Sequence, residues 1–478
     1  MGTEGRRLYC RCVYFFDVFF FLHFSSFSST LISIPHSKTK PSLPKKKQEG
    51  YEVEDPCLDP IRAVLAPRFD KQRISSLDSD RRWARSLDGE PFVPGIVGLN
   101  NLAGRTDFAN AVLQSLARVG PLRDFFLDPS NYRHAASSQL VCRFGDFLRR
   151  VWNDRAFRGH VSPHELMVAV ERVSKGRFSP GGGGGNGGGT GSKKGSKTKT
   201  ELQRSASTDA AAFLVWLLNA LHVDLVIPPG PTAPSGAVAA RISGGARSIV
   251  TACFQGEVEV TTETATVAGG GGGGGASRSE TSTTRSKFLM LALDPPPAPL
   301  YQDALEQNII PQVALASLLA KYDGRTVTDD AKAGRRTLRI TKLPRFLLLH
   351  VRRFARNAFF AEKNPTIVNF PVKGLPLGEL LRYKSSSKQQ DNDEPFRYDL
   401  AANVAHEGPA AAGVFKAHVQ RKSDGAWFEC CDLRVAETLP QVVALSEAYV
   451  QVWEKRPVVK AAVAAAAGGG AVPMDEAS

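Results

Sequence analysis

The stretch of sequence that decides the fold is GLNNLAGRTDFANAVLQSL, residues 98–116. Its second half predicts a helix over 107–119, because apolar residues recur there at the three- and four-residue spacing of one helical face. These residues are Phe108, Val112, Leu113 and Leu116. Asp107 precedes them and suits the N-terminal end of the helix, where a carboxylate can accept hydrogen bonds from free backbone N–H groups.

A second helix and several strands follow along the chain. Thr208-Asp209 begins the helix, and a wide apolar stripe over 213–221 predicts that it packs on a core. The run 346–351 is almost continuously apolar, as in a strand that is buried on both faces. Further strands are predicted over 398–404, over 415–419 and from Trp427-Phe428 onward. Because helices come first and strands later, the sequence predicts an α+β fold.

Composition places the chain among folded proteins. The chain has 478 residues, more than one ordinary domain. Hydrophobic residues make up 42% and charged residues 23%, a composition that excludes wholesale disorder. The net charge of +14 is concentrated in 1–50 and 181–208, which carry nine of the excess positive charges. Glycine runs at 181–195, 269–275 and 468–470 hold 20 of the 43 glycines. Most of the excess positive charge therefore lies in the leader and one insertion, so the net charge does not indicate a nucleic-acid-binding surface.

Shifts in composition predict the domain boundaries. The predicted parts are a disordered leader (1–50), a linker region (51–90), one folded domain (91–456) with flexible insertions at 179–206, 228–247 and 265–287, and a disordered tail (457–478). In the leader, the apolar run 13–24 follows arginines like the h-region of a signal peptide, but Asp17 and His23 interrupt it. We expect a poorly structured leader, with a signal or anchor as the alternative, and no membrane span elsewhere.

Cysteine usage indicates reduced thiols. Seven cysteines in 478 residues are sparse and odd in number, which does not suggest a disulfide framework. The sequence has no C-x-x-C pair, so neither a zinc ribbon nor a thioredoxin-like site is expected. We predict no bound metal and no cofactor.

Four segments, in this order, resemble the ubiquitin-specific protease family. They are 98–116, like the nucleophile box G-L-x-N-L-G-N-T-C-Y; 209–222, like the Q-D-A-x-E-F helix; 343–354, like L-P-x-x-L-x-x-x-L-K-R-F; and 398–449, like the strands that carry the family's histidine. Each motif is weak alone, but four in order over about three quarters of the chain are specific. The resemblance implies a papain-like fold with a helical thumb, a β palm and β fingers.

The same resemblance implies that the catalytic positions are vacant. The family uses a cysteine nucleophile, a histidine base and an orienting side chain. Asp107 stands at the nucleophile position, or Thr106 if the register moves by one, and neither offers a thiol. Val414 stands at the base position and Cys431 at the orienting position. Asn101 matches a position that supports the oxyanion, a role without use unless a nucleophile attacks.

Another set of thiols and histidines is the alternative source of catalysis. The candidates are Cys142, Cys253, Cys430 and Cys431 as nucleophiles, with His350, His406 and His418 as bases. Each of these residues is more readily interpreted as core or surface filling, because a working pair must lie within hydrogen-bond reach. Because it lacks both the nucleophile and the base, the sequence resembles the inactive, spliceosomal branch of the family. Four phrases carry this closer resemblance: 93–97, 160–165, 362–371 and 445–453.

The spliceosomal branch implies a function and a location. It implies an inactive scaffold in tri-snRNP assembly and pre-mRNA splicing, in the nucleus, with small nuclear ribonucleoprotein proteins as partners. Ubiquitin or a ubiquitin-like protein is a further candidate partner, and RNA is expected to be reached only indirectly. Region 51–90 resembles the trailing remnant of the branch's zinc finger without its ligands. The alternatives are a deubiquitinase of unusual mechanism and a module that binds ubiquitin without cutting.

Overall fold

The structure is a computed structural model. It describes residue 64 and residues 67–179, 209–226, 247–266, 278–297, 310–330, 334–356, 361–383, 396–410 and 412–457. The chain divides into two units, Met1–Asp55 and Pro56–Ser478, and every described residue belongs to the second unit. The predicted leader, nearly all of the predicted tail 457–478 and most of the insertions 179–206 and 228–247 lie outside the described residues.

Helices dominate the first part of the described chain. They are α2 (Lys71–Ser76), α3 (Asp107–Leu116), α4 (Gly120–Leu127), α5 (Gln139–Val151), α6 (His164–Val173), α8 (Ala210–Leu225) and α10 (Ile249–Phe254), followed later by α11 (Leu315–Leu319), α12 (Leu377–Leu380) and α13 (Pro440–Leu445). Short 3-10 turns occupy Leu102–Gly104, Pro129–Ala135 and Ala320–Tyr322. Helix α3 ends before the predicted Val119, because Val119 is extended as the N-cap of α4. No helix among the described residues is long and apolar enough to cross a membrane.

Strands dominate the second part, which confirms the α+β prediction. A seven-stranded sheet, the palm, has the order β18-β17-β16-β15-β19-β11-β7. Its strands are β18 (Arg434–Thr438), β17 (Trp427–Cys431), β16 (Val414–Gln420), β15 (Tyr398–Glu407), β19 (Ala448–Lys455), β11 (Phe346–Val351) and β7 (Met290–Leu293). Small two-stranded pairs join β1 (Ala84–Arg85) to β2 (Pro91–Phe92), β3 (Gly98–Leu99) to β4 (His160–Val161), β12 (Phe354–Arg356) to β13 (Ala361–Lys363), and β14 (Ile367–Asn369) to β8 (Gln312–Ala314).

The palm sheet separates two hydrophobic cores. Alternate side chains of β11 face opposite sides, so Phe346 and Leu348 join the core formed with α3, α5 and α8. Leu347 and Leu349 join the second core, which includes residues of α11, α12 and α13. The prediction of a strand buried on both faces at 346–351 is therefore confirmed, and one palm face packs against the helices of the thumb.

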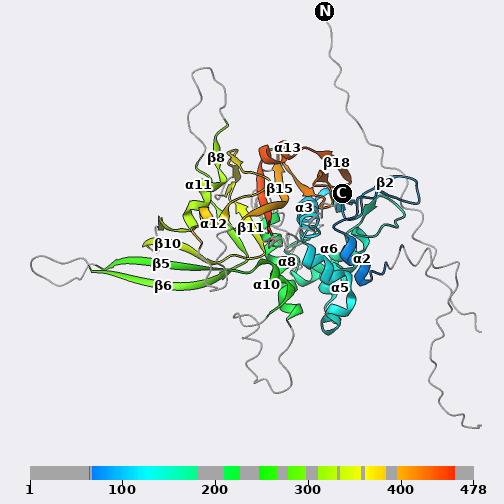
Figure 1. The fold of residues 1–478 in the computed structure, drawn as a ribbon, viewed down its shortest axis with the longest axis horizontal. Helices are drawn as coiled ribbons and strands as arrows, with labels where there is room; N and C mark the ends of the chain where they lie inside the picture. Colours follow the sequence, from blue (N-terminus) through cyan, green and yellow to red (C-terminus); the bar gives the residue numbers. More distant parts are fainter. Residues whose placement is uncertain are drawn as a thin grey trace, which may run out of the picture. The chain divides into compact units, whose positions relative to one another are not determined.

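A second sheet, the fingers, corrects one prediction. Its order is β6-β5-β10-β9, with β5 (Gly256–Thr266), β6 (Arg278–Phe288), β10 (Gly334–Lys342) and β9 (Asp323–Asp330). Figure 1 shows β5, β6 and β10 running side by side. The predicted flexible insertion at 265–287 is therefore wrong for residues 265–266, which end β5, and for residues 278–287, which lie in β6. Threonine and serine cannot supply a buried apolar face, but the β-branched threonines fit an exposed ladder.

The folded unit also begins earlier than residue 91. Strands β1 and β2 pair antiparallel across that predicted boundary. Phe69 is buried in the first core, and Asp78 forms an ion pair with Arg123 of α4 at 2.6 Å. Residues 67–90 are therefore packed on the domain and do not form a separate linker. The sequence of residues 67–90 did not indicate this packing, because the segment is mostly polar and few of its apolar side chains, such as Phe69, contact the core.

Candidate functional site

Asp107 lies in the first turn of α3 and reaches across to strand β16. Its carboxylate oxygen Oδ2 accepts a hydrogen bond of 2.9 Å from the backbone N–H of Phe415. Burial raises the pKa of the Asp107 carboxyl above its usual value, and the charge of Asp432 acts in the same direction. The side chain at the predicted nucleophile position is thus a carboxylate that joins the thumb to the palm.

Val414 is the first residue of β16 and directly precedes the residue that binds Asp107. Its aliphatic side chain is 38% exposed and can neither accept nor donate a proton. The preceding Gly413 is packed so closely that an added Cβ would meet the ring of His406 and the carbonyl oxygen of Glu407 at 2.2 and 2.5 Å. The predicted base position therefore lies beside Asp107 and carries no base.

Cys431 ends strand β17 beside these residues. Burial raises the pKa of its thiol, with the charges of Asp432, Glu429 and Asp107 acting in the same direction and Lys416 opposing them. A raised pKa keeps the thiol protonated at neutral pH, whereas a nucleophilic cysteine needs a lowered pKa. The structure thus brings Asp107, Val414 and Cys431 together, and these three side chains do not pair a nucleophile with a base.

Asp432 organises this site, and sequence reasoning did not assign it that role. Its two carboxylate oxygens accept hydrogen bonds of 2.8 Å from the side-chain amides of Asn101 and Asn110. Asp432 has a positive φ of 52°, a left-handed conformation that aspartate tolerates better than most residues. The backbone of Leu433, directly after Asp432, lies so close to strand β3 that position 98 requires glycine, because an added Cβ would lie 2.5 Å from the carbonyl oxygen of Leu433. The available signal was a carboxylate directly after the orienting position.

Both polar atoms of the Asn101 side chain, at the predicted oxyanion position, form hydrogen bonds. Its amide nitrogen donates to Asp432, while its oxygen Oδ1 accepts from the backbone N–H of Thr106 at 2.8 Å and from the Thr106 hydroxyl at 3.1 Å. Thr106 is itself fully buried and its hydroxyl oxygen accepts from the N–H of Leu102. Both side chains therefore hold the loop before α3, and Thr106 gives the alternative register no exposed nucleophile.

The other three cysteines among the described residues are buried, with raised thiol pKa values, or lie outside the site. Burial raises the pKa values of Cys253 and Cys430 to about 12. Cys142 lies on α5 and its thiol donates to the carbonyl oxygen of Ala136 at 3.5 Å. Among the described residues, no cysteine thiol is hydrogen-bonded to a histidine ring.

The three candidate bases lie in the palm, where His406 and His418 are buried and His350 is half-buried. Burial lowers the pKa values of His350 and His406 to about 4, and it also lowers the pKa of His418. The ring of His406 packs edge-on against Phe354 and Phe415, with centroid distances of 5.0 and 4.8 Å. Each histidine is therefore neutral near neutral pH and held by neighbouring rings or polar side chains, with no thiol to activate.

Comparison with known proteins adds to the geometry. The family described as ubiquitin carboxyl-terminal hydrolase matches residues 97–453. The chain is 37% identical over 422 residues to the protein named Ubiquitin carboxyl-terminal hydrolase 39 of Pongo abelii, covering 85% of this chain and 67% of that one. It is 31% identical over 413 residues to the Probable mRNA-splicing protein ubp10 of Schizosaccharomyces pombe, covering 85% and 74%.

One solved structure shares the fold. It is described as the crystal structure of an essential yeast splicing factor, and it superposes with a TM-score of 0.54 at 20% sequence identity. The likeness covers 85% of this chain and 80% of the other. The fold of thumb, palm and fingers is therefore shared with known proteins, and the family match spans Asn101, Asp107, Val414 and Cys431.

Proposed function

Because the chain belongs to the ubiquitin carboxyl-terminal hydrolase family, we propose that it is a catalytically inactive member that serves as a protein scaffold in pre-mRNA splicing. It acts in the nucleus, binds small nuclear ribonucleoprotein proteins of the tri-snRNP, and reaches RNA through those partners. The observation that carries the proposal is the hydrogen bond between Asp107 and the backbone N–H of Phe415 at the centre of the vacated site.

The chemistry of the site supports the absence of catalysis. Papain-like hydrolysis requires a thiolate that attacks the carbonyl carbon and a base that takes and returns a proton. Attack by the Asp107 carboxylate on an isopeptide would form an anhydride, a higher-energy intermediate than a thioester. Val414 cannot return a proton to the leaving amine. The half-buried Cys431 has a raised thiol pKa, so it does not replace the missing nucleophile.

The relatives support the splicing part of the proposal. The names of two of them, the fission yeast mRNA-splicing protein and the essential yeast splicing factor, refer to splicing. The first relative also aligns over 85% of this chain, so the likeness is not confined to one motif. A retained fold with altered catalytic positions is what we expect of a protein whose function is to bind other proteins through its surface.

Affinity purification tests the scaffold function. The tagged full chain is expressed in cells, purified from nuclear extract at moderate salt and analysed by quantitative mass spectrometry. We expect enrichment of small nuclear ribonucleoprotein proteins over a tag-only control, and their retention after nuclease treatment if proteins form the contact. Recovery of no such proteins, or their complete loss on nuclease treatment, would contradict the proposal.

Titration with labelled ubiquitin separates this scaffold from a module that shields ubiquitin. A scaffold that has no ubiquitin function shows a dissociation constant weaker than about 1 mM, equivalent to about −4 kcal/mol. Saturable binding in the micromolar range would favour the ubiquitin-binding alternative, whether or not splicing proteins are also recovered.

A further inference from the structure

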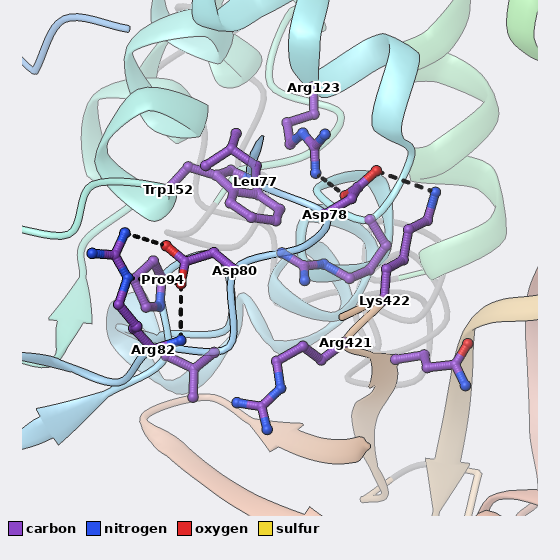
Figure 2. Close-up of a pocket in the computed structure, with 12 residues that line it drawn as sticks. Leu77, Asp78, Asp80, Arg82, Pro94, Arg123, Trp152, Arg421 and Lys422 are labelled. Atoms are coloured by element: carbon purple, nitrogen blue, oxygen red, sulfur yellow. Dashed lines mark hydrogen bonds and ion pairs between the residues drawn. The ribbon is translucent and has the colours of Figure 1, made fainter. Parts of the chain in front are cut away.

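A small cavity lies away from the vacated catalytic positions. It is bounded by the segment 77–82, the residues that follow α3 and α5, and the turn between β16 and β17 (Figure 2). Asp107 begins α3 and Arg118 follows its end, so the rise of the helix separates the two places by roughly 15 Å. No residue assigned to the catalytic positions lines this cavity.

Two buried arginines and a tryptophan form one wall of the cavity. The guanidinium carbons of Arg118 and Arg123 lie 4.4 and 4.5 Å from the ring centroid of Trp152. These three side chains are only 6%, 2% and 5% exposed. Cation–π contacts of this kind hold the guanidinium groups in fixed orientations. The wall is therefore preorganised, and binding an anion here would require little further ordering of the arginines.

Two hydrogen-bond donors of this wall have no acceptor among the described residues. They are Nε of Arg118 and Nε1 of Trp152, and both atoms are buried. Arg118 donates through Nη2 to the carbonyl oxygen of Gly95, but it has no carboxylate partner in the described part of the chain. Burial lowers the pKa of Arg118 to about 9, and the nearby charge of Arg123 adds to this effect. An acceptor with negative charge would satisfy both donors and offset the cost of the buried cation.

The charges around the cavity are unequal. Its lining includes five cationic side chains and two carboxylates: Arg82, Arg118, Arg123, Arg421 and Lys422 against Asp78 and Asp80. In Figure 2, dashed lines join Asp78 to Arg123 and Lys422, and Asp80 to Arg82. Arg123, Arg421 and Lys422 are also paired with carboxylates outside the lining, namely Asp124, Asp424 and Glu454. Among the described residues, Arg118 is therefore the lining cation that has no ion pair, and it is the group that an incoming anion would meet.

Size and shape select the kind of anion. The cavity volume of about 40 Å³ exceeds the roughly 10–15 Å³ that one water needs, but is far below the ~300 Å³ of a small-molecule pocket. A carboxylate group fits, and its two oxygens match the planar fork of an arginine. Trp152 is too buried to stack on a nucleotide base, and the part-exposed Asp78 and Asp80 would repel a continuous phosphate backbone.

We propose that this cavity is a docking socket for a carboxylate side chain in an acidic segment of a protein partner. Arg118 and Trp152 donate to the carboxylate oxygens. The socket extends the scaffold function with a specific contact. Its test does not depend on that function, because binding of a peptide is measured directly.

Fluorescence anisotropy with a labelled oligoglutamate peptide tests the socket on the full chain. We expect saturable binding below about 1 mM for oligoglutamate and none for an oligoglutamine peptide of the same length. Arg118→Met should weaken binding about 10- to 100-fold, as loss of a charge-assisted hydrogen bond predicts. The matched control is Arg143→Met on α5, which removes an exposed arginine paired with Glu165 and should change binding less than about twofold.

A milder variant separates loss of peptide binding from a folding defect. Trp152→Phe keeps most of the ring but removes the Nε1 donor, so we expect weaker peptide binding with an unchanged circular dichroism spectrum. Equal binding by the original chain, Arg118→Met and Trp152→Phe would overturn the proposal, as would the absence of binding to oligoglutamate at 1 mM. Displacement of the peptide by single-stranded RNA, with RNA affinity lost in Arg118→Met, would show a phosphate site and also overturn it.

Discussion

At the scale of single residues, two carboxylates hold the candidate site together. Asp107 accepts from the backbone of β16, and Asp432 accepts from the amides of Asn101 and Asn110. The apolar pattern of α3 predicted that Asp107 begins this helix, and the structure confirms that start. The assignment of Asp107 to the nucleophile position rests on the family resemblance and stays a prediction. The sequence did not predict the bond from Asp107 to Phe415, since these residues are 308 positions apart and only the packing of α3 on the palm brings them together.

The role of Asp107 leads to a prediction about stability and pH. A raised carboxyl pKa means that the folded state favours the protonated form, so the charge of Asp107 costs stability at neutral pH and this cost disappears as the pH falls. Asp107→Asn, which keeps an acceptor for Phe415, should be at least as stable as the original chain at neutral pH, with a difference that shrinks in acid.

The matched variant for this prediction removes the acceptor. Asp107→Ala leaves the N–H of Phe415 without its partner and should cost about 1 kcal/mol. Urea unfolding at several pH values measures both variants. If Asp107→Asn is destabilised as much as Asp107→Ala at neutral pH, the charge itself is required and the structural interpretation of Asp107 is incorrect.

Asp432 should matter more for stability than Asp107. Asp432→Ala removes both acceptors from Asn101 and Asn110, and Asn110 is only 2% exposed, so we expect a loss of about 2–3 kcal/mol in the free energy of unfolding. Asp432→Asn keeps one oxygen and tolerates the left-handed backbone, and should lose less. Chemical denaturation distinguishes the two variants, and equal stability of Asp432→Ala and the original chain would contradict the role of Asp432.

At the scale of elements, the thumb depends on aromatic contacts between α3 and α8. Phe213 of α8 meets Phe108 of α3 edge-on at 5.4 Å and Phe178 at 5.3 Å. The sequence predicted that a helix begins at Thr208-Asp209, and in the structure Asp209 is the N-cap of α8 and accepts from the first free N–H groups. It missed β6, whose sequence RSETSTTRSKF is polar up to its last residue and carries no hydrophobic period.

A substitution in α8 tests this packing. Phe213→Ala removes a fully buried ring and should lower the free energy of unfolding by about 3–5 kcal/mol. Val223→Ala lies on the same helix but is 46% exposed, and should change stability by less than about 0.5 kcal/mol. Thermal or urea unfolding compares the pair, and a similar small effect of both would mean that α8 does not pack as described.

The palm contains a detail that no sequence pattern indicates. Leu400 and Ala402 of β15 are two residues apart and should share one face of a regular strand, yet Leu400 belongs to the second core and Ala402 to the first. The pairing with β19 shifts between these two residues, which marks a β-bulge. Bulges of this kind depend on the partner strand, so the local sequence predicts the strand but not the side of each residue.

At the scale of the whole molecule, buried histidines make the folded state sensitive to acid. Burial lowers the pKa values of His350 and His406 to about 4 from an ordinary 6.5. Their stabilisation is present above about pH 6.5 and is lost as the pH falls towards 4, because the unfolded chain binds protons first. This sign is opposite to that of Asp107.

Replacing one histidine tests this acid sensitivity. His406→Phe keeps a ring between Phe354 and Phe415 but cannot bind a proton. Relative to its own stability at about pH 7, the variant should lose roughly 1–2 kcal/mol less than the original chain at about pH 5. Urea midpoints at both pH values give the comparison, and an unchanged dependence on pH would show that His406 titrates as an exposed histidine.

The central claim is that the fold is retained without catalysis. The most direct measurement incubates the full chain with a ubiquitin that carries an electrophile at its C-terminus, and reads the intact mass. An active deubiquitinase serves as the positive control. We expect no ubiquitin adduct on this chain, because burial raises the thiol pKa values of Cys253, Cys430 and Cys431 and no thiol among the described residues is hydrogen-bonded to a histidine ring. A stoichiometric adduct that disappears in Cys431→Ser or Cys142→Ser would contradict this expectation.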